Sequence, residues 1–144
     1  MIEPDTIQLL RECDAGVKMG VASIDGVLEH VKNEEFRRCL TSCKQDHEAL
    51  DHELQGLLDK YHDEGKNPNP MAKGMSWMKT NVMLGVNETD ETVASMMTDG
   101  CNMGVKSLHR YLNQYQAADE TSKNIAKRLI HLEEQLTADM RRFL

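Results

Sequence analysis

Aromatic residues, prolines and long apolar runs are all scarce in this chain, and each shortage narrows the possible folds. Of the 144 residues, 4% are aromatic and three are proline. The interior must therefore be filled by Leu, Val, Ile and the ten Met. No apolar run approaches the ~20 residues that a transmembrane helix needs, and the first residues have no signal-peptide pattern. We therefore expect a cytoplasmic protein.

Positive charge is also in short supply. The chain has 17 Lys and Arg against 24 Asp and Glu, which gives a formal net charge of -7 at pH 7. A protein that binds nucleic acid usually presents a basic stripe to the phosphates, and no such cluster runs along this sequence. The same deficit argues against an anionic membrane surface. We therefore expect neither a nucleic acid nor a membrane as a partner.

Cysteines are few and scattered, without a C-x-x-C pair that would indicate zinc binding or redox work. The four are Cys13, Cys39, Cys43 and Cys101. Free cysteine is among the most buried residue types and often packs as a small hydrophobic side chain. We interpret all four as reduced, structural thiols.

What the sequence does contain is helical periodicity. Apolar residues recur at steps of three and four, which predicts amphipathic helices. The expected helices cover about residues 5–31, 34–62, 89–116 and 120–144. Asp5 with Gln8 resembles a capping box. The second helix should start just after Asn33 and the third near Thr89, where NETDE supplies cap-type residues. Asp119, Thr121 or Ser122 is the candidate cap of the fourth. The length fits one domain over residues 1–144.

The connections predict the topology. The first two segments, and the last two, are joined by short links, so each pair should form an antiparallel hairpin. A long segment separates the pairs, with Met71, Met75, Met78 and Val82 at helical spacing. The expected fold is an all-α, ferritin-like four-helix bundle of two antiparallel hairpins, joined by a long crossover that contains a short helix.

Two stretches, GMSWMK in the crossover and DGCNMGVKSLHRYLNQY in the third long segment, add to this layout. With them, the chain resembles a bacterial ferritin-like family of unknown function, one of the small stress-associated bundle groups. The resemblance implies the ferritin-like fold. Di-iron members of the wider fold use one Glu from each of two helices and a Glu-x-x-His from each of the others.

That ligand pattern is largely missing from this chain. The residue three before His47 is Lys44. The fourth segment carries the reverse order, His131-x-x-Glu134, beside its predicted apolar stripe of Leu129, Leu132 and Leu136. The third segment reads DGCNMG where a Glu would be needed. We therefore expect no complete di-iron site.

His47 is the strongest candidate for a role beyond packing, because it interrupts the apolar stripe of the second segment. Folding the first hairpin at its turn sets position 18 beside His47 and Asp14 beside Asp51. His47 is then either a neutral core histidine, bonded to Asp14 or to a backbone carbonyl, or a ligand. Asp46, Glu48 and the nearby charges read as a solvated helix face.

Two hypotheses of function remain. In the first, the chain is a non-catalytic structural or interaction protein without a cofactor, and a homodimer is consistent with that role. In the second, it is a metal-binding or oxidoreductase-type bundle. Its reduced ligand set would be Asp14, His47 and Asp51, and the metal would be iron, manganese or zinc.

Overall fold

The computed structural model describes residues 3–68 and 89–144, and this part of the chain is helical without any strand. The elements are α1 (Pro4–Leu28), α2 (Glu34–Lys60), α4 (Asp90–Gln114), α5 (Glu120–Met140) and the 3₁₀ turn η1 (Arg141–Phe143). The all-α prediction is thus confirmed. The short helix expected near Met71 lies outside the described residues. Among those described, no helix is long and apolar enough to cross a bilayer.

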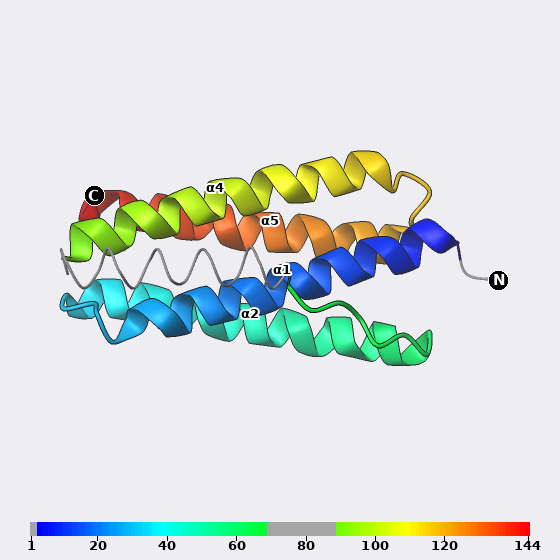
Figure 1. The fold of residues 1–144 in the computed structure, drawn as a ribbon, viewed down its shortest axis with the longest axis horizontal. Helices are drawn as coiled ribbons and strands as arrows, with labels where there is room; N and C mark the ends of the chain where they lie inside the picture. The colour runs from blue at the N-terminus through cyan, green and yellow to red at the C-terminus, as the bar shows by residue number, and fades with distance from the viewer. Residues whose placement is uncertain (1–2, 69–88) are drawn as a thin grey trace.

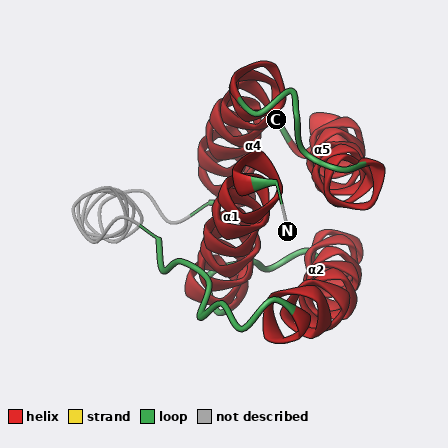
Figure 2. Cartoon of the chain, turned by 90° about the vertical axis from the view of Figure 1, so that its right-hand side faces the viewer, coloured by secondary structure: helices red, strands yellow, loops and turns green. Residues whose placement is uncertain are grey.

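The four helices form a bundle of two hairpins. Figure 1 shows α1 and α2 running antiparallel, and likewise α4 and α5, whereas α2 and α4 run in the same direction. In the end-on view of Figure 2, α1 lies between α2 and α4. Helix α5 packs on α4, α2 and α1. The chain therefore has to travel the length of the bundle between its two hairpins.

Side-chain caps explain where three of the helices begin. Asn33 Oδ1 accepts hydrogen bonds from Glu35 N at 2.8 Å and Phe36 N at 3.1 Å. Thr89 caps α4, and Asp119 Oδ1 accepts from Ser122 N at 2.8 Å to start α5. Such caps satisfy amides that have no partner inside the helix. The sequence placed helix starts beside Asn33 and near Thr89, and Asp119 was one of its three cap candidates for the last helix.

The capping box predicted at Asp5 is wrong. Helix α1 begins one residue earlier, at Pro4, and its N-cap Glu3 makes no side-chain cap bond. Proline suits this position because its missing N–H would have had no helical partner there. The Asp5 carboxylate instead accepts from Ala117 N at 3.0 Å, in the turn between α4 and α5. The first turn of α1 therefore serves a tertiary contact.

Each hairpin turn is held by the other hairpin. At one end of the bundle, Thr6 Oγ1 accepts from Asp119 N at 2.9 Å, next to the Asp5 contact. At the opposite end, the Asp90 carboxylate accepts from Lys32 N at 2.8 Å and Asn33 N at 2.9 Å. These bonds satisfy turn amides that no helix supplies with a partner. We refer to the Asp5 and Thr6 bonds at one end, and to the Asp90 bonds at the other, as the two end ties.

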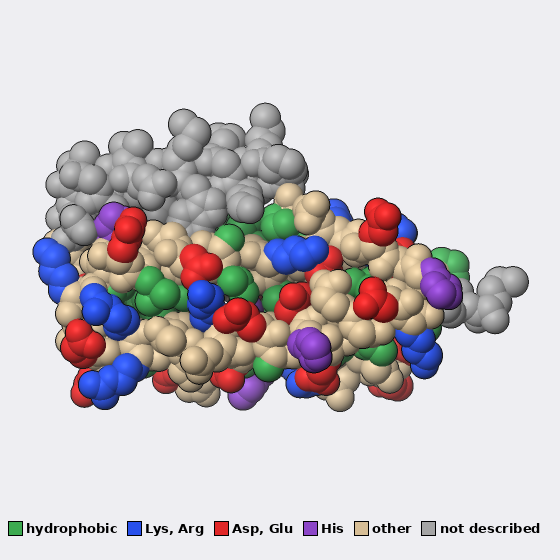
Figure 3. All heavy atoms as spheres, turned by 90° about the horizontal axis from the view of Figure 1, so that it is seen from below, with side chains coloured by type: hydrophobic (Ala, Val, Ile, Leu, Met, Phe, Trp, Pro, Cys, Tyr) green, Lys and Arg blue, Asp and Glu red, His purple; other side chains and the backbone are tan. Residues whose placement is uncertain are grey.

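The core follows the predicted stripes. The fully buried apolar side chains include Leu10, Val17, Phe36, Leu40, Leu54, Leu129 and Met140. Phe36 stacks on Phe143 at 4.6 Å between ring centroids, which joins η1 to the core. On the face drawn in Figure 3, Lys and Arg are interspersed with Asp and Glu. Four described polar side chains are also buried: Thr6, Asp14, His47 and Ser122.

Candidate functional site

A cavity of about 430 Å³ lies between α1 and α4. Helix α5 contributes Leu129, Glu133 and Leu136 to its lining, and α2 contributes His47. Small-molecule sites in proteins are mostly apolar hollows of about 300–1,000 Å³ with a few placed polar groups. The α1–α4 cavity has that size and composition. Bundles commonly place ligand sites between facing helices in this way.

Small and flexible residues form its walls. The glycines and alanine that line it leave room where larger side chains would fill the space: Ala15, Gly16, Gly20, Gly100 and Gly104. Four methionines complete the apolar lining: Met19, Met96, Met97 and Met103. Methionine adapts to irregular shapes because its side chain is unbranched and polarizable. Met103 is 70% exposed, so it stands at the rim of the cavity.

His47 brings an acceptor to this lining. Its Nδ1 lies 2.8 Å from the Cys43 carbonyl oxygen, which can only accept, so Nδ1 carries the proton. Nε2 is then an acceptor in the neutral ring, and it is buried without a hydrogen-bond partner. Burial lowers the pKa of His47, which keeps the ring neutral. Of the alternatives for His47, the structure contains the bond to a backbone carbonyl.

Glu133 is the second buried polar group of the cavity. Its Oε2 is buried without a hydrogen-bond partner. Desolvation raises the pKa of this carboxyl to about 8, so the neutral acid predominates at pH 7. The side chain fits because Gly104 faces it: a Cβ there would lie 2.5 Å from Oε2. A bulkier residue at position 104 would have to displace the carboxyl.

Sequence reasoning missed Glu133, although a signal for it exists. The positions 129, 133, 136 and 140 step by four, three and four, so Glu133 shares the inward register of Leu129 and Met140. The predicted stripe used Leu132 instead, because an apolar residue is the usual occupant of such a position. In the structure Leu132 is only partly buried. A charged residue in helical register with buried leucines was the clue.

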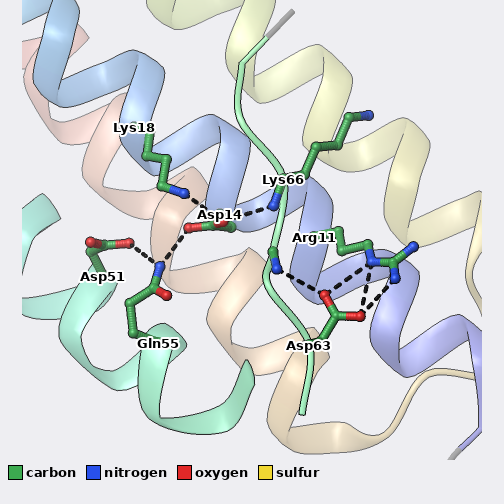
Figure 4. A network of polar contacts seen from close by, with 8 residues as sticks. Arg11, Asp14, Lys18, Asp51, Gln55, Asp63 and Lys66 are labelled. Carbon is green, nitrogen blue, oxygen red and sulfur yellow. Dashed lines mark hydrogen bonds and ion pairs between the residues drawn. The ribbon is translucent and has the colours of Figure 1, made fainter. Parts of the chain in front are cut away.

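Asp14 is fully buried within a network of its own (Figure 4). Its Oδ2 accepts from Lys18 Nζ and from the backbone N of Lys66, both at 2.9 Å. Its Oδ1 accepts from Gln55 Nε2 at 2.7 Å, and the same amide group donates to Asp51 at 3.2 Å. Three donors from three segments therefore satisfy the carboxylate.

The three predicted ligands are consequently divided between two places. Asp14 and Asp51 share Gln55, whereas His47 lies against Gly20, where a Cβ would come within 2.8 Å of the ring. Lys18 was expected beside His47, but helical side chains lean toward the N-terminus of their helix. His47 thus meets α1 further along than its own Cα level. Within residues 3–68 and 89–144, no three His, Cys, Asp or Glu side chains are grouped as metal ligands.

The loop that follows α2 borders the cavity and is fastened to α1. Asp63 pairs with Arg11 at 2.7 Å and accepts from Gly65 N at 2.9 Å. Gly65 has a φ of +80°, and a Cβ there would collide with the Asp14 carboxylate, so only glycine fits. Lys66, which lines the cavity, pairs with Glu12 at 2.5 Å. Asp14 therefore helps to place one edge of the cavity.

The cysteines behave as structural side chains. All four are free, and Cys13, Cys43 and Cys101 are buried. Burial raises the pKa of each of these three thiols to about 12, so the thiolate is strongly disfavoured at neutral pH. The burial of Cys13, Cys43 and Cys101 fits their interpretation as structural side chains, whereas Cys39 is partly exposed.

Comparison with known proteins gives no family for the chain. No family model, no curated protein and no solved structure matches it. The α1–α4 cavity, with its unpaired His47 and Glu133 atoms, is therefore the best guide to function.

Proposed function

We propose that the protein is a non-catalytic four-helix bundle that binds one small, largely apolar molecule in the α1–α4 cavity. One observation carries this proposal: His47 and Glu133 both line the cavity, and each has a buried polar atom without a hydrogen-bond partner. Leaving such a group unpaired costs about 1–3 kcal/mol. A bound molecule that supplied the missing partners would recover part of this cost.

Under this proposal the chain has a ferritin-like topology, but its bundle interior binds a small molecule instead of two metal ions. Two antiparallel hairpins with parallel α2 and α4 support a ferritin-like topology, because that arrangement needs a long crossover. Two of the polar side chains that line this mainly apolar hollow, His47 and Glu133, have an unpaired buried atom. The bundle interior then serves as a binding site, which develops the hypothesis of an interaction protein.

The binding test uses 1-hexanol, which has an apolar body and one hydroxyl group. Its titration into protein labelled with ¹³C at the methionine methyl groups should shift the signals of Met96, Met97 and Met103, which line the cavity. A Gly100→Leu variant should weaken binding at least several-fold, because a Cβ at this cavity position has open space around it. The new side chain can then fill the hollow.

Gly56→Leu is the matched control. A Cβ at Gly56 also has open space, but the residue lies outside the α1–α4 cavity. This variant should bind 1-hexanol as the wild type does. Unchanged methionine signals at millimolar 1-hexanol, or equal binding by the Gly100→Leu variant, would refute a ligand site in this cavity.

The proposal also makes a statement about metals. Protein purified without chelator should hold far less than one equivalent of iron, manganese or zinc, as measured by elemental analysis. Stoichiometric metal that disappears in a His47→Ala variant would favour the metal-binding hypothesis instead. An Asp51→Ala variant is the second test of this hypothesis, because Asp51 belongs to the predicted ligand set and accepts from Gln55 at 3.2 Å.

A further inference from the structure

We infer that the molecule bound in the α1–α4 cavity is a primary amine with an apolar body, an alkyl- or arylalkyl-ammonium ion whose charged group pairs with the Glu133 carboxylate. This inference rests on the proposed function, since it names the chemical class that the same cavity takes. His47 supplies a further acceptor for the same ligand.

The polar atoms favour a ligand rich in donors. Nε2 of His47 is an acceptor, because the bond to the Cys43 carbonyl places the ring proton on Nδ1. The Glu133 carboxyl becomes a pure acceptor when it ionises, and it rotates easily about its terminal bond. A primary ammonium offers three donors and no acceptor. A carboxylate ligand would be repelled by the ionised Glu133, and it has no proton to donate to the lone pair of His47 Nε2.

The walls favour an apolar body behind the charged group. Met19, Met96 and Met97 can adjust to either a linear or a ring-shaped hydrocarbon. Met103 stands exposed at the rim, where it can fold over an apolar chain that has entered. In this water-poor setting an ammonium–carboxylate pair is stronger than the same pair in solvent. The net charge of -7 also attracts cations toward the protein.

Binding of the ammonium ion requires Glu133 to release its proton to solvent, so affinity is linked to pH. The other titratable groups that line the cavity are Glu12 on α1, His47 on α2, Lys66 in the loop, and Cys101 and Tyr111 on α4. Cys43 on α2 is close enough to sense the charge of Glu133.

Of the groups whose pKa is shifted here, Glu133 is the one that changes charge near pH 8. Burial raises the pKa of the Cys43 and Cys101 thiols to about 12, and desolvation lowers the pKa of His47. The Tyr111 pKa is raised as well, and Lys66 is paired with Glu12. Desolvation raises the pKa of Glu133 to about 8. Affinity for the amine should therefore rise up to tenfold per pH unit as pH approaches 8 from below.

The experiment is isothermal titration calorimetry with three probes of equal chain length: hexylammonium, 1-hexanol and hexanoate. We expect hexylammonium to bind most tightly at pH 8, with one site per chain and release of one proton at pH 7. Glu133→Gln should weaken hexylammonium binding at least tenfold while leaving 1-hexanol binding nearly unchanged. Glu134→Gln, at an exposed neighbouring position, should leave both unchanged.

The outcomes separate this inference from the proposed function. If 1-hexanol binds more tightly than hexylammonium at pH 8, or if Glu133→Gln leaves hexylammonium binding intact, the amine assignment is wrong but the cavity remains a ligand site. If none of the three probes binds, both are wrong. Equal weakening by Glu134→Gln would show that the amine binds the acidic surface, and it too would overturn the assignment. Circular dichroism checks that each variant is folded.

Discussion

At the scale of single residues, Glu133 is the side chain whose chemistry departs furthest from its behaviour in water. A glutamate normally ionises near pH 4.5, but here desolvation raises the pKa to about 8. Between these values the folded chain keeps a proton that the unfolded chain loses. The stability that the folded protein gains from holding this Glu133 proton is complete below about pH 4.5. It is lost as the pH rises through about 8.

The raised pKa of Glu133 predicts that the free energy of unfolding falls with increasing pH. The free energy of unfolding should fall by up to about 1.4 kcal/mol per pH unit from Glu133 alone across that window. In Glu133→Gln the contribution disappears, so the difference between variant and wild type should grow with pH. Urea denaturation at several pH values measures it, with Glu134→Gln as the control. Parallel profiles for wild type and Glu133→Gln would show that Glu133 ionises normally in the folded protein.

Gly20 shows how a single missing methyl group makes room for His47. An alanine Cβ at position 20 would lie 2.8 Å from the imidazole, closer than real Cβ atoms come. Gly20→Ala should therefore destabilise the fold by about 1–3 kcal/mol, despite the better helix propensity of alanine. Gly56→Ala, also within a helix but with open space around it, should stabilise by about 0.5–1 kcal/mol. Thermal or urea denaturation of the pair tests the ring position; equal effects would contradict it.

At the scale of elements, Asp14 joins α1, α2 and the loop that borders the cavity. Asp14→Ala would leave Gln55 Nε2 and Lys66 N without their buried partner, and it should cost about 3 kcal/mol. Asp51→Ala removes a single, longer bond from the same Gln55 and should cost less than about 1 kcal/mol. Denaturant unfolding measures both. Similar losses in the two variants would mean that Asp14 is not the centre of the network.

The elements also show how far sequence reasoning reached. The stripe of α2 was predictable because Leu40, Leu50 and Leu54 recur in one heptad register, in which His47 is the polar member. The meeting of α1 with α2 was predicted less well, since the lean of long side chains shifts their contacts along the partner helix. The inward position of Glu133 was not predicted, because the helical spacing of the fourth segment fits Leu132 as well as Glu133. Leu132 and Glu133 are both partly buried, and the missing side chain at Gly104 leaves room for the Glu133 carboxyl in the cavity lining.

At the scale of the whole molecule, the end ties make each hairpin depend on the other. Asp90→Ala removes the acceptor for Lys32 N and Asn33 N and should cost about 1 kcal/mol. Thr6→Ala removes the acceptor for Asp119 N and should cost about the same. The two sites lie at opposite ends of a bundle roughly 37 Å long, because α1 has 25 residues.

Distant sites should act independently, so the double variant should lose the sum of the two single losses to within about 0.5 kcal/mol. Urea denaturation of the four proteins in this cycle measures the sum. Glu91→Ala, at an exposed position beside Asp90, should change stability by less than about 0.5 kcal/mol. A loss in the double variant well above the sum would show that the hairpins separate once one tie is gone.

The end ties have a consequence for exchange between chains. A domain-swapped dimer, in which the second hairpin of one copy docks on the first hairpin of another, would rebuild the Asp90 and Thr6 bonds between chains. The ties therefore select which surfaces of the hairpins meet, without selecting which chain supplies them. The long connection, whose closure entropy grows only slowly with length, then decides between a closed monomer and a swapped pair. Shortening that connection would favour the swapped pair without altering a single bond of either tie.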